Sequence, residues 1–271
     1  MKIGVDIGGT KIRAGLVDSY SVVHNVITEP CPADAGKEEV IDRVIAIVSK
    51  LYCDEVHLIG FGVPAIVDED GVVYDCVNIP SWDRVELKKI MEEEFGVPVK
   101  VNNDCNCFIL GVANSEYGKG YRNIVGITLG TGVGAGLILN GEPYTGLNNC
   151  AGEIGCMKYR GKDYESYCSS QFFLNLGKTA KDEAQKAREG EREAILLWEE
   201  FGTNVGDLIN MVTLAYDPQV IVIGGGISNS FDLFEPAMRR QMATFPYLTV
   251  ISDLKLFSDP SGDLMLSGSV L

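Results

Sequence analysis

Two turns rich in glycine and threonine are the segments of this sequence best suited to bind an anion. One lies in IGVDIGGTKIRAGLV and contains Gly8, Gly9 and Thr10; the other lies in VGITLGTGVGAGLIL and contains Gly130, Thr131 and Gly132. Glycine lets backbone N–H groups approach an anion without interference from a Cβ atom, and threonine adds a hydroxyl donor. Such turns also occur in ordinary β-hairpins, and neither matches the patterns GxxxxGK or GxGxxG. The residues therefore allow two interpretations, a clamp for polyphosphate and a pair of hairpin turns.

A third glycine run and one aspartate are further candidates. The run GGG at residues 224–226 follows the apolar segment PQVIVI, where it could border a nucleoside or simply connect a strand to a helix. Asp104 follows the strand-like segment VPVKVNN and precedes a predicted helix. Its position suits a general base, and it equally suits a helix N-cap, a role in which aspartate is common. Position alone favours the cap.

The segment CAGEIGCMKYRGKDYESYC combines three cysteines with acidic residues. Cys150, Cys156 and Cys168 have the spacing C-x5-C-x11-C, without the close cysteine pair that is usual in zinc sites. The two histidines of the chain, His24 and His57, lie far away in the sequence. Disulfides are the minor interpretation, because MKIGVDIG is not a signal peptide and we expect a cytoplasmic protein with reduced thiols.

Composition and charge exclude several classes of partner. The net charge of −15 repels phosphate backbones and anionic membranes, and no cluster of lysine or arginine offsets it locally. No apolar run approaches the roughly 18 residues of a membrane span. The 271 residues, 46% of them hydrophobic, are enough for one large domain or two of ordinary size. We therefore expect a small-molecule substrate, with no nucleic acid and no membrane as partner.

Alternating helix and strand patterns predict an α/β protein. Residues 2–28 read as three consecutive strands, and residues 36–52 place Val40, Val44, Ile47, Val48 and Leu51 on one helical face. Further helices are predicted near 84–95, after Asp104 and over 191–215, with strands at VHLIGFGVP, VPVKVNN and PQVIVIGGG and a hairpin over 122–139. The shared plan of residues 3–17 and 125–139 indicates two related halves.

Five motifs, taken together and in this order, resemble those of the ROK family of sugar kinases. They are DIGGTK at 6–11, VNND at 101–104, LGTGVGAG at 129–136, AGEIG at 151–155 and IGGGIS at 223–228. The resemblance covers nearly the entire chain. It implies two ribonuclease-H-like domains of the actin-like ATPase fold around a central cleft. We place the first domain, with the sugar site and first phosphate turn, at 1–115, and the second, with the second phosphate turn and the nucleotide site, at 116–271.

The resemblance also implies a role for each candidate residue in the phosphorylation of a hexose or hexose derivative by ATP and Mg²⁺. Asp104 corresponds to the aspartate that accepts the proton of the attacked hydroxyl group. Sugar hydroxyls are recognised by planar acceptors and amides, and the candidates are Asn103, Glu153, Glu165, Asn78 and Gly62. ATP is assigned to Asp6, which lies near Mg²⁺, and to Gly8, Gly9, Thr10, Lys11, Gly130, Thr131, Gly132, Gly225 and Gly226. Trp82 either stacks on the sugar or packs in the core.

The sequence departs from the family pattern after Glu153. Members usually continue with a histidine and a CxCGxxGCxE loop, which bind a structural zinc ion. Here Cys156 occupies the histidine position and the loop is much shorter. We therefore expect no structural zinc, and a loop held by packing, with Tyr164, Tyr167 and Phe172 as apolar anchors. The chain also ends at SGSVL, so we expect no terminal helix of the kind that many members carry.

An alternative from another class is a catalytically idle, sugar-sensing ROK protein. Some members are transcriptional repressors that bind DNA through an added N-terminal helix-turn-helix. This chain begins directly at its first strand, which disfavours a DNA-binding repressor. The candidate base and both phosphate turns favour the enzyme, for which we expect a homodimer. The sequence leaves the identity of the hexose open.

Overall fold

The computed structural model describes residues 1–271, which form two compact units. The first unit comprises Met1–Lys119, Pro143–Ala151 and Asp263–Leu271, and the second comprises Gly120–Glu142 and Gly152–Gly262. These units differ from the predicted ranges 1–115 and 116–271, because two later segments of the chain return to the first unit.

The first unit is built on a five-stranded sheet in the order β3-β2-β1-β4-β8. Its strands are β1 (Lys2–Ile7), β2 (Lys11–Val17), β3 (Val23–Pro30), β4 (Ile59–Val63) and β8 (Val99–Asn103). β1, β2 and β3 form the predicted antiparallel meander, whereas β4 pairs in parallel with both β1 and β8. The carboxyl ends of three strands therefore meet at one edge of the sheet. A small second sheet, β5 (Ile66–Val67), β6 (Val73–Tyr74) and β7 (Arg84–Val85), was not predicted.

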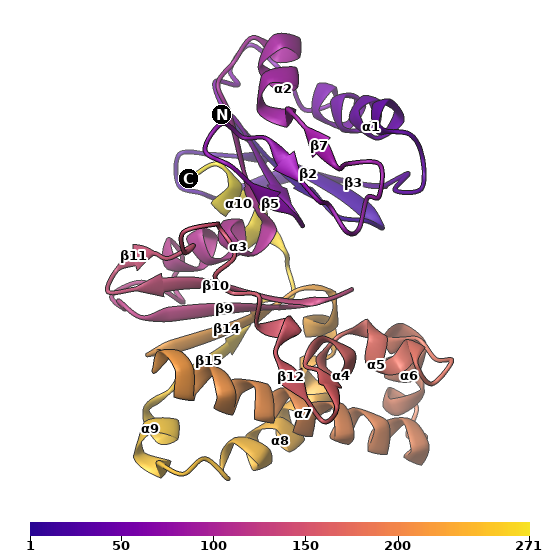
Figure 1. Ribbon diagram of the computed structural model, residues 1–271, viewed down its shortest axis with the longest axis vertical. Coiled ribbons are helices and arrows are strands. Elements are labelled where there is room, and N and C mark those ends of the chain that lie inside the picture. Colours follow the sequence, from indigo (N-terminus) through magenta and orange to yellow (C-terminus); the bar gives the residue numbers. More distant parts are fainter. The chain divides into compact units, whose positions relative to one another are not determined.

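Helices cover both faces of the first sheet. α1 (Lys37–Ser49) and α2 (Leu87–Phe95) lie on one face, and α3 (Asp104–Ala113) and α10 (Asp263–Ser269) lie on the other (Figure 1). α1 buries the predicted stripe of Val40, Val44, Ile47 and Val48. This spacing puts four β-branched side chains on the side of the helix that faces the core.

The terminal helix α10 corrects the expectation that the chain would end without one. A Cβ atom on Gly4 of β1 would lie 2.1 Å from the carbonyl oxygen of Leu266, and one on Gly111 of α3 would lie 1.9 Å from that of Leu264. Glycine at both positions therefore lets the backbone of α10 approach closely. This packing also explains why residues 263–271 belong to the first unit.

The second unit repeats the strand order of the first. Its sheet runs β11-β10-β9-β14-β15, with β9 (Ile124–Leu129), β10 (Val133–Leu139), β11 (Glu142–Pro143), β14 (Val220–Gly224) and β15 (Lys255–Ser258). In chain order, both sheets run third, second, first, fourth, fifth. β9 and β10 form the predicted hairpin, and β14 lies parallel between β9 and β15. The predicted relation between the two halves is thus confirmed in their topology.

The remaining helices of the second unit pack around this sheet and against one another. They are η1 (Ile154–Cys156), α4 (Glu165–Cys168), α5 (Ser170–Leu174), α6 (Ala180–Arg188), α7 (Arg192–Tyr216), η2 (Gly226–Ser230), α8 (Phe231–Met242) and α9 (Leu248–Asp253). α7 and α8 lie side by side along one side of the sheet (Figure 1). Buried aromatic rings join them; those of Phe201 and Phe234 lie 5.3 Å apart. Among the helices of the protein, none has the length and apolar character to cross a membrane.

Candidate active site

The carboxyl ends of β1, β4 and β8 bring together four of the predicted site residues. Asp6 of β1 pairs in register with Gly62 of β4, whose next residue pairs with Asn103 at the end of β8. Asp104 follows as the first residue of α3, and a Cβ atom on Gly62 would lie 3.5 Å from its Cα atom. In open α/β sheets, ligands bind outside the carboxyl ends of the strands. This edge is therefore a candidate site.

The start of α3 is capped chiefly by Asn103. Its Oδ1 atom accepts hydrogen bonds from the backbone N–H groups of Cys105 (2.9 Å) and Asn106 (3.3 Å), and its Nδ2 atom donates to the carbonyl oxygen of Ala65 (3.3 Å). Asp104 also accepts from Cys105 N–H, at 2.8 Å, and is only partly buried. The cap therefore does not depend on Asp104 alone, although position in the sequence had favoured that role.

Asp6 is a half-buried carboxylate under the influence of two cations. Burial raises the pKa of Asp6, and the charges of Arg13 and Lys11 partly oppose this effect. Arg13 faces Asp6 across the β1–β2 pair and forms an ion pair of 3.3 Å with Asp263. Asp6 therefore lies in an environment that favours a proton or a cation at its carboxylate.

The first glycine turn connects β1 to β2 and contacts another predicted residue. The backbone N–H of Gly8 donates to the carbonyl oxygen of Lys11 at 2.9 Å, which closes the turn. A Cβ atom on Gly9 would lie 2.6 Å from the carbonyl oxygen of Asn78. Thr10 and Lys11 are exposed. The structure thus brings Asn78 against the turn, and only glycine fits at position 9.

In the second unit, the second glycine turn lies against Glu165. The Oε2 atom of Glu165 accepts a hydrogen bond of 3.1 Å from the backbone N–H of Val133. A Cβ atom on Gly132 would lie 2.4 Å from the same oxygen. Thr131, beside it, is exposed. Glu165 was predicted to bind the sugar, and the structure places its carboxylate on the predicted phosphate turn.

The third glycine run lies beside the same turn. Gly225 adopts a φ of +85°, a conformation that favours glycine, and a Cβ atom on it would lie 2.4 Å from the carbonyl oxygen of Leu129. A Cβ atom on Gly130 would lie 4.0 Å from the backbone nitrogen of Gly226, which is exposed. The predicted nucleotide-binding segments of this unit therefore converge.

Glu153 approaches the same region from the GEIG motif. The backbone N–H of Ala135 in β10 donates to the carbonyl oxygen of Gly152 at 2.9 Å, which ties the motif to the sheet. Desolvation by the surrounding protein and, to a smaller degree, the charge of Glu165 raise the pKa of Glu153, although part of the residue is exposed. The charge of Glu165 therefore reaches the carboxyl group of Glu153.

Comparison with known proteins decides the family. A model of the ROK family matches residues 2–250. This chain belongs to the ROK family. The ROK protein is 26% identical to the glucokinase of Thermotoga maritima, over 95% of this chain and 92% of the relative, and 30% identical to the N-acetyl-D-glucosamine kinase of Vibrio parahaemolyticus, over 97% and 96%.

Solved structures agree with this assignment. A ROK family glucokinase from Streptomyces griseus, in complex with glucose and AMPPNP, superposes on the ROK protein with a TM-score of 0.86 at 25% identity, covering 99% of this chain and 97% of that one. A ROK hexokinase from Thermus thermophilus superposes with a TM-score of 0.76, covering 99% and 96%. The predicted family and the actin-like ATPase fold are confirmed.

The segment after Glu153 does not fit a zinc ion in this ROK protein. Burial raises the pKa of the Cys168 thiol, so the thiolate that zinc binds is disfavoured. Cys156 is exposed, and Cys150 belongs to the first unit rather than the second. The second unit contains no histidine.

The predicted anchors of this segment form part of a larger cluster. Tyr164 and Phe172 are buried, and Tyr167 is half-buried. Sequence reasoning missed Tyr159 and Asp207, which are hydrogen-bonded to each other at 2.5 Å. Because they are 48 residues apart, no local pattern could have paired them. The one sequence feature that could have indicated an aromatic cluster is that Tyr159, Tyr164 and Tyr167 lie close together in this segment.

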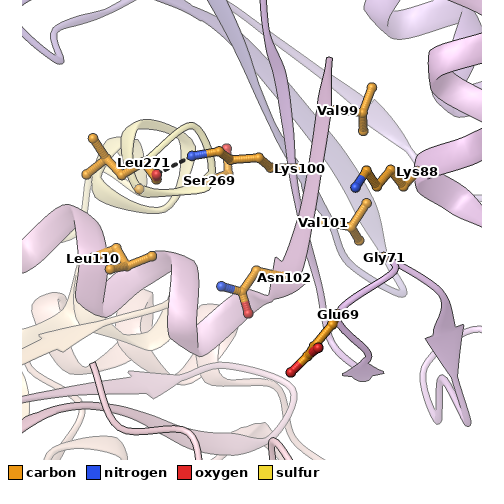
Figure 2. Close-up of a pocket in the computed structure, with 11 residues that line it drawn as sticks. Glu69, Gly71, Lys88, Val99, Lys100, Val101, Asn102, Leu110, Ser269 and Leu271 are labelled. Atoms are coloured by element: carbon orange, nitrogen blue, oxygen red, sulfur yellow. Dashed lines mark hydrogen bonds between the residues drawn. The ribbon is translucent and has the colours of Figure 1, made fainter. Parts of the chain in front are cut away.

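Two features lie outside the candidate site, and one of them, Trp82, was considered as a sugar contact. Trp82 is fully buried, so its ring packs in the core and does not stack on a sugar. A cavity of about 310 Å³ lies along β8, the edge strand of the first sheet, with Lys88 and Lys100 on its wall (Figure 2). The Nζ atom of Lys100 donates to the backbone carbonyl oxygen of Leu271. None of the predicted site residues lines this cavity.

Proposed function

We propose that this ROK protein transfers the terminal phosphoryl group of ATP to a hydroxyl group of a hexose or hexose derivative, with Asp104 as the general base. The class of activity, an ATP-dependent sugar kinase, is confirmed by glucokinase and N-acetyl-D-glucosamine kinase relatives that match nearly the whole chain. The roles of individual residues are our proposal. The observation that carries it is the position of Asp104 at the shared carboxyl edge of β1, β4 and β8.

Asp104 has the chemistry that this reaction requires. Phosphoryl transfer passes through a loose transition state, so the protein mainly positions the reactants, neutralises charge and accepts a proton. A partly exposed carboxylate at a strand end can accept the proton of the sugar hydroxyl as its oxygen attacks phosphorus. Asn103 accepts two of the backbone N–H bonds that cap α3, so the cap does not require the carboxylate of Asp104. A general base typically contributes about 10²–10⁴-fold to the rate.

We assign ATP to the glycine segments and Mg²⁺ to the vicinity of Asp6. The backbone N–H groups of Gly9, Thr10 and Lys11 in the first turn, and of Thr131 and Gly132 in the second, are suited to phosphate oxygens. Those of Gly8 and Gly130 close their turns by donating to the carbonyl oxygens of Lys11 and Gly132, and Gly225 and Gly226 are suited to the nucleoside. Mg²⁺ is commonly held by one or two carboxylates together with substrate phosphates. The desolvated Asp6 fits such an ion, which would neutralise phosphate charge when bound.

We assign sugar recognition to five polar groups of the chain. Asn78, Asn103 and the backbone at Gly62 belong to the first unit, and Glu153 and Glu165 belong to the second. Carboxylates and amides accept or donate two hydrogen bonds at once, so a site of this type discriminates strongly against a missing hydroxyl group. Because desolvation raises the pKa of Glu153, its ionised form would be stabilised by a hydrogen bond donated by a sugar hydroxyl group.

We also propose that the enzyme works as a cytoplasmic homodimer on a free sugar, without nucleic acid or membrane. The net charge of −15 supports the exclusion of polyanionic partners. Sedimentation equilibrium measures the subunit number directly, and a monomer at micromolar concentration would contradict the proposed dimer.

The decisive experiment replaces Asp104 with Asn, which preserves shape and removes the base. ATP consumption is first measured across hexoses, hexosamines and glycosides. With the best sugar, Asp104→Asn should lower kcat at least ~10²-fold while calorimetry still detects sugar binding. The control is Asp54→Asn, at an exposed position of the same unit. An unchanged kcat in Asp104→Asn would eliminate Asp104 as the base, and sugar binding without any ATP consumption by the parent would favour the idle sensor.

A further inference from the structure

A short hairpin separates the two candidate carboxylates of the second unit. Its strands, β12 (Lys158–Tyr159) and β13 (Lys162–Asp163), lie between Glu153 and Glu165 in the chain. The turn between them, at Arg160 and Gly161, has positive φ at both residues. An isolated two-stranded hairpin is at best marginally stable in water. Contacts with the rest of the unit must therefore hold it in place.

Asp207 of α7 makes the central contact. Its Oδ2 atom accepts a hydrogen bond of 2.5 Å from the hydroxyl group of Tyr159 in the hairpin. Its Oδ1 atom accepts one of 2.5 Å from Nε2 of Gln241 in α8. The guanidinium group of Arg160 lies 3.8 Å from Oδ2 and also 5.1 Å above the Tyr159 ring. One carboxylate thus joins the hairpin to both long helices of the unit.

Stacked rings extend this contact to Glu165. The ring of Tyr159 stacks on that of Tyr164, with 4.4 Å between centroids and 12° between planes, and meets the edge of Tyr167 at 5.4 Å. Tyr164 directly precedes Glu165, and its backbone N–H donates to the carbonyl oxygen of Met157 at 3.0 Å. Tyr159 therefore packs against Tyr164, the residue that precedes α4, and Glu165 is the first residue of α4.

Glu165 in turn contacts the second glycine turn. Its Oε2 atom is bonded to Val133 N–H and fills the space beside Gly132. A continuous series of contacts therefore leads from Asp207 through Tyr159 and Tyr164 to the backbone of the turn.

We propose that Tyr159 and Asp207 are positioning residues, which fix Glu165 and through it the phosphate-binding form of the turn at Gly132, in a segment whose residues do not fit a metal ion. The proposal rests on the proposed function in assigning this turn to ATP. Neither residue is among those that we assign to ATP or to the sugar. Hydrogen bonds to charged groups are among the stronger ones in proteins, so loss of the Tyr159 hydroxyl group should have a measurable effect.

The test uses Tyr159→Phe and Asp207→Asn in the full chain. Tyr159→Phe keeps the stacked ring and removes the hydroxyl group. The control is Tyr164→Phe, which removes a hydroxyl group from the same stack and leaves the bond to Asp207 intact. The first readout is the affinity for Mg²⁺ and AMPPNP, by calorimetry well below the melting temperature. The second is hydrogen exchange at the backbone of residues 130–133.

Both Tyr159→Phe and Asp207→Asn should weaken nucleotide binding about 10-fold and speed exchange in the turn, and Tyr164→Phe should change affinity less than about 2-fold. A role confined to stability predicts a lower melting temperature with unchanged affinity and exchange in the folded protein, and that result overturns the proposal. If the parent itself neither binds AMPPNP nor transfers phosphate, the proposed function fails; exchange in the turn then still decides whether the network positions it.

Discussion

The Oε2 atom of Glu165 accepts a 3.1 Å hydrogen bond from the backbone N–H of Val133, and Gly132 leaves the space that this carboxylate occupies. The turn that we assign to ATP phosphates is therefore fixed by an acidic side chain on its other side. Because Val133 N–H is already bonded to Glu165, phosphate oxygens have to be bound by the remaining groups of the turn.

Gly132→Ala should disturb this arrangement, because its Cβ atom would lie 2.4 Å from the carboxylate. We expect a KM for ATP at least ~10-fold higher and a free energy of unfolding lower by about 1–3 kcal/mol, as is usual for overpacking. Gly226→Ala is the informative comparison, since no atom lies within 4 Å of its Cβ position. It should leave stability unchanged and still raise the KM for ATP. Steady-state kinetics measure the KM for ATP, and urea denaturation measures the free energy of unfolding. If Gly132→Ala has the same KM and the same stability as the parent, Glu165 does not contact Gly132 as described.

Asp6→Asn should stabilise the protein while impairing it as an enzyme. The pKa of Asp6 is raised in the folded state above its usual 3.8, so folding disfavours the ionised form. Asparagine cannot ionise, so at pH values above the folded-state pKa the variant avoids the free-energy cost of desolvating a charged carboxylate. The advantage should shrink as the pH falls through the folded-state pKa and disappear below 3.8, where the parent is protonated in both states. Melting temperatures of parent and variant across this pH range test the effect on stability, and the Mg²⁺ dependence of kcat tests the effect on the enzyme. A variant that is less stable near neutral pH would show that the carboxylate is stabilising.

Gly60→Ala should release the terminal helix. The new Cβ atom would lie 2.1 Å from the carbonyl oxygen of Ser269, a backbone atom that cannot simply rotate away. We expect destabilisation of about 2–3 kcal/mol or more, together with faster proteolysis of the last residues. Gly36→Ala serves as the control, because the nearest atom to its Cβ position is 4.0 Å away. Equal stability of the two variants would mean that α10 does not pack as described.

The purified protein should contain far less than one equivalent of zinc. Burial raises the pKa of the Cys168 thiol, and the hydroxyl group of Tyr159 in the hairpin is hydrogen-bonded to Asp207. A zinc chelator, added with Mg²⁺ in excess, should leave the melting temperature and kcat unchanged. Metal analysis measures the content. Stoichiometric zinc that is lost together with activity would reveal a site involving these cysteines.

The sequence predicts best those parts of the fold whose pattern is local. The valine and isoleucine stripe of α1 and the Gly/Thr plan shared by β1–β2 and β9–β10 required no knowledge of distant residues. α10 was missed because DLMLSGS has a poor intrinsic helix propensity, and its helix depends on contacts with glycines early in the chain. The two-residue strands β5, β6 and β7 are too short to show any periodicity.

The candidate site was predictable as a set of residues, but not as a set of contacts. Asn103 and Asp104 were both singled out, yet only the hydrogen bonds reveal that Asn103 carries most of the helix cap. Glu165 was assigned to the sugar from its place in a motif, whereas its bond to Val133 depends on tertiary packing. Tyr159 and Asp207 carry no motif at all.

The packing of α10 on β1 has a consequence for synthesis of the protein on the ribosome. Gly4 emerges among the first residues, but the backbone that covers it, at Leu266, is added more than two hundred and fifty residues later. Contacts of such long range form slowly, because the intervening chain must be closed into a loop before they stabilise anything. The second unit, by contrast, ends at Gly262 and is complete before α10 has been made. During translation, the unit that begins first is therefore the one that finishes last, and its nascent sheet must wait with one face partly uncovered.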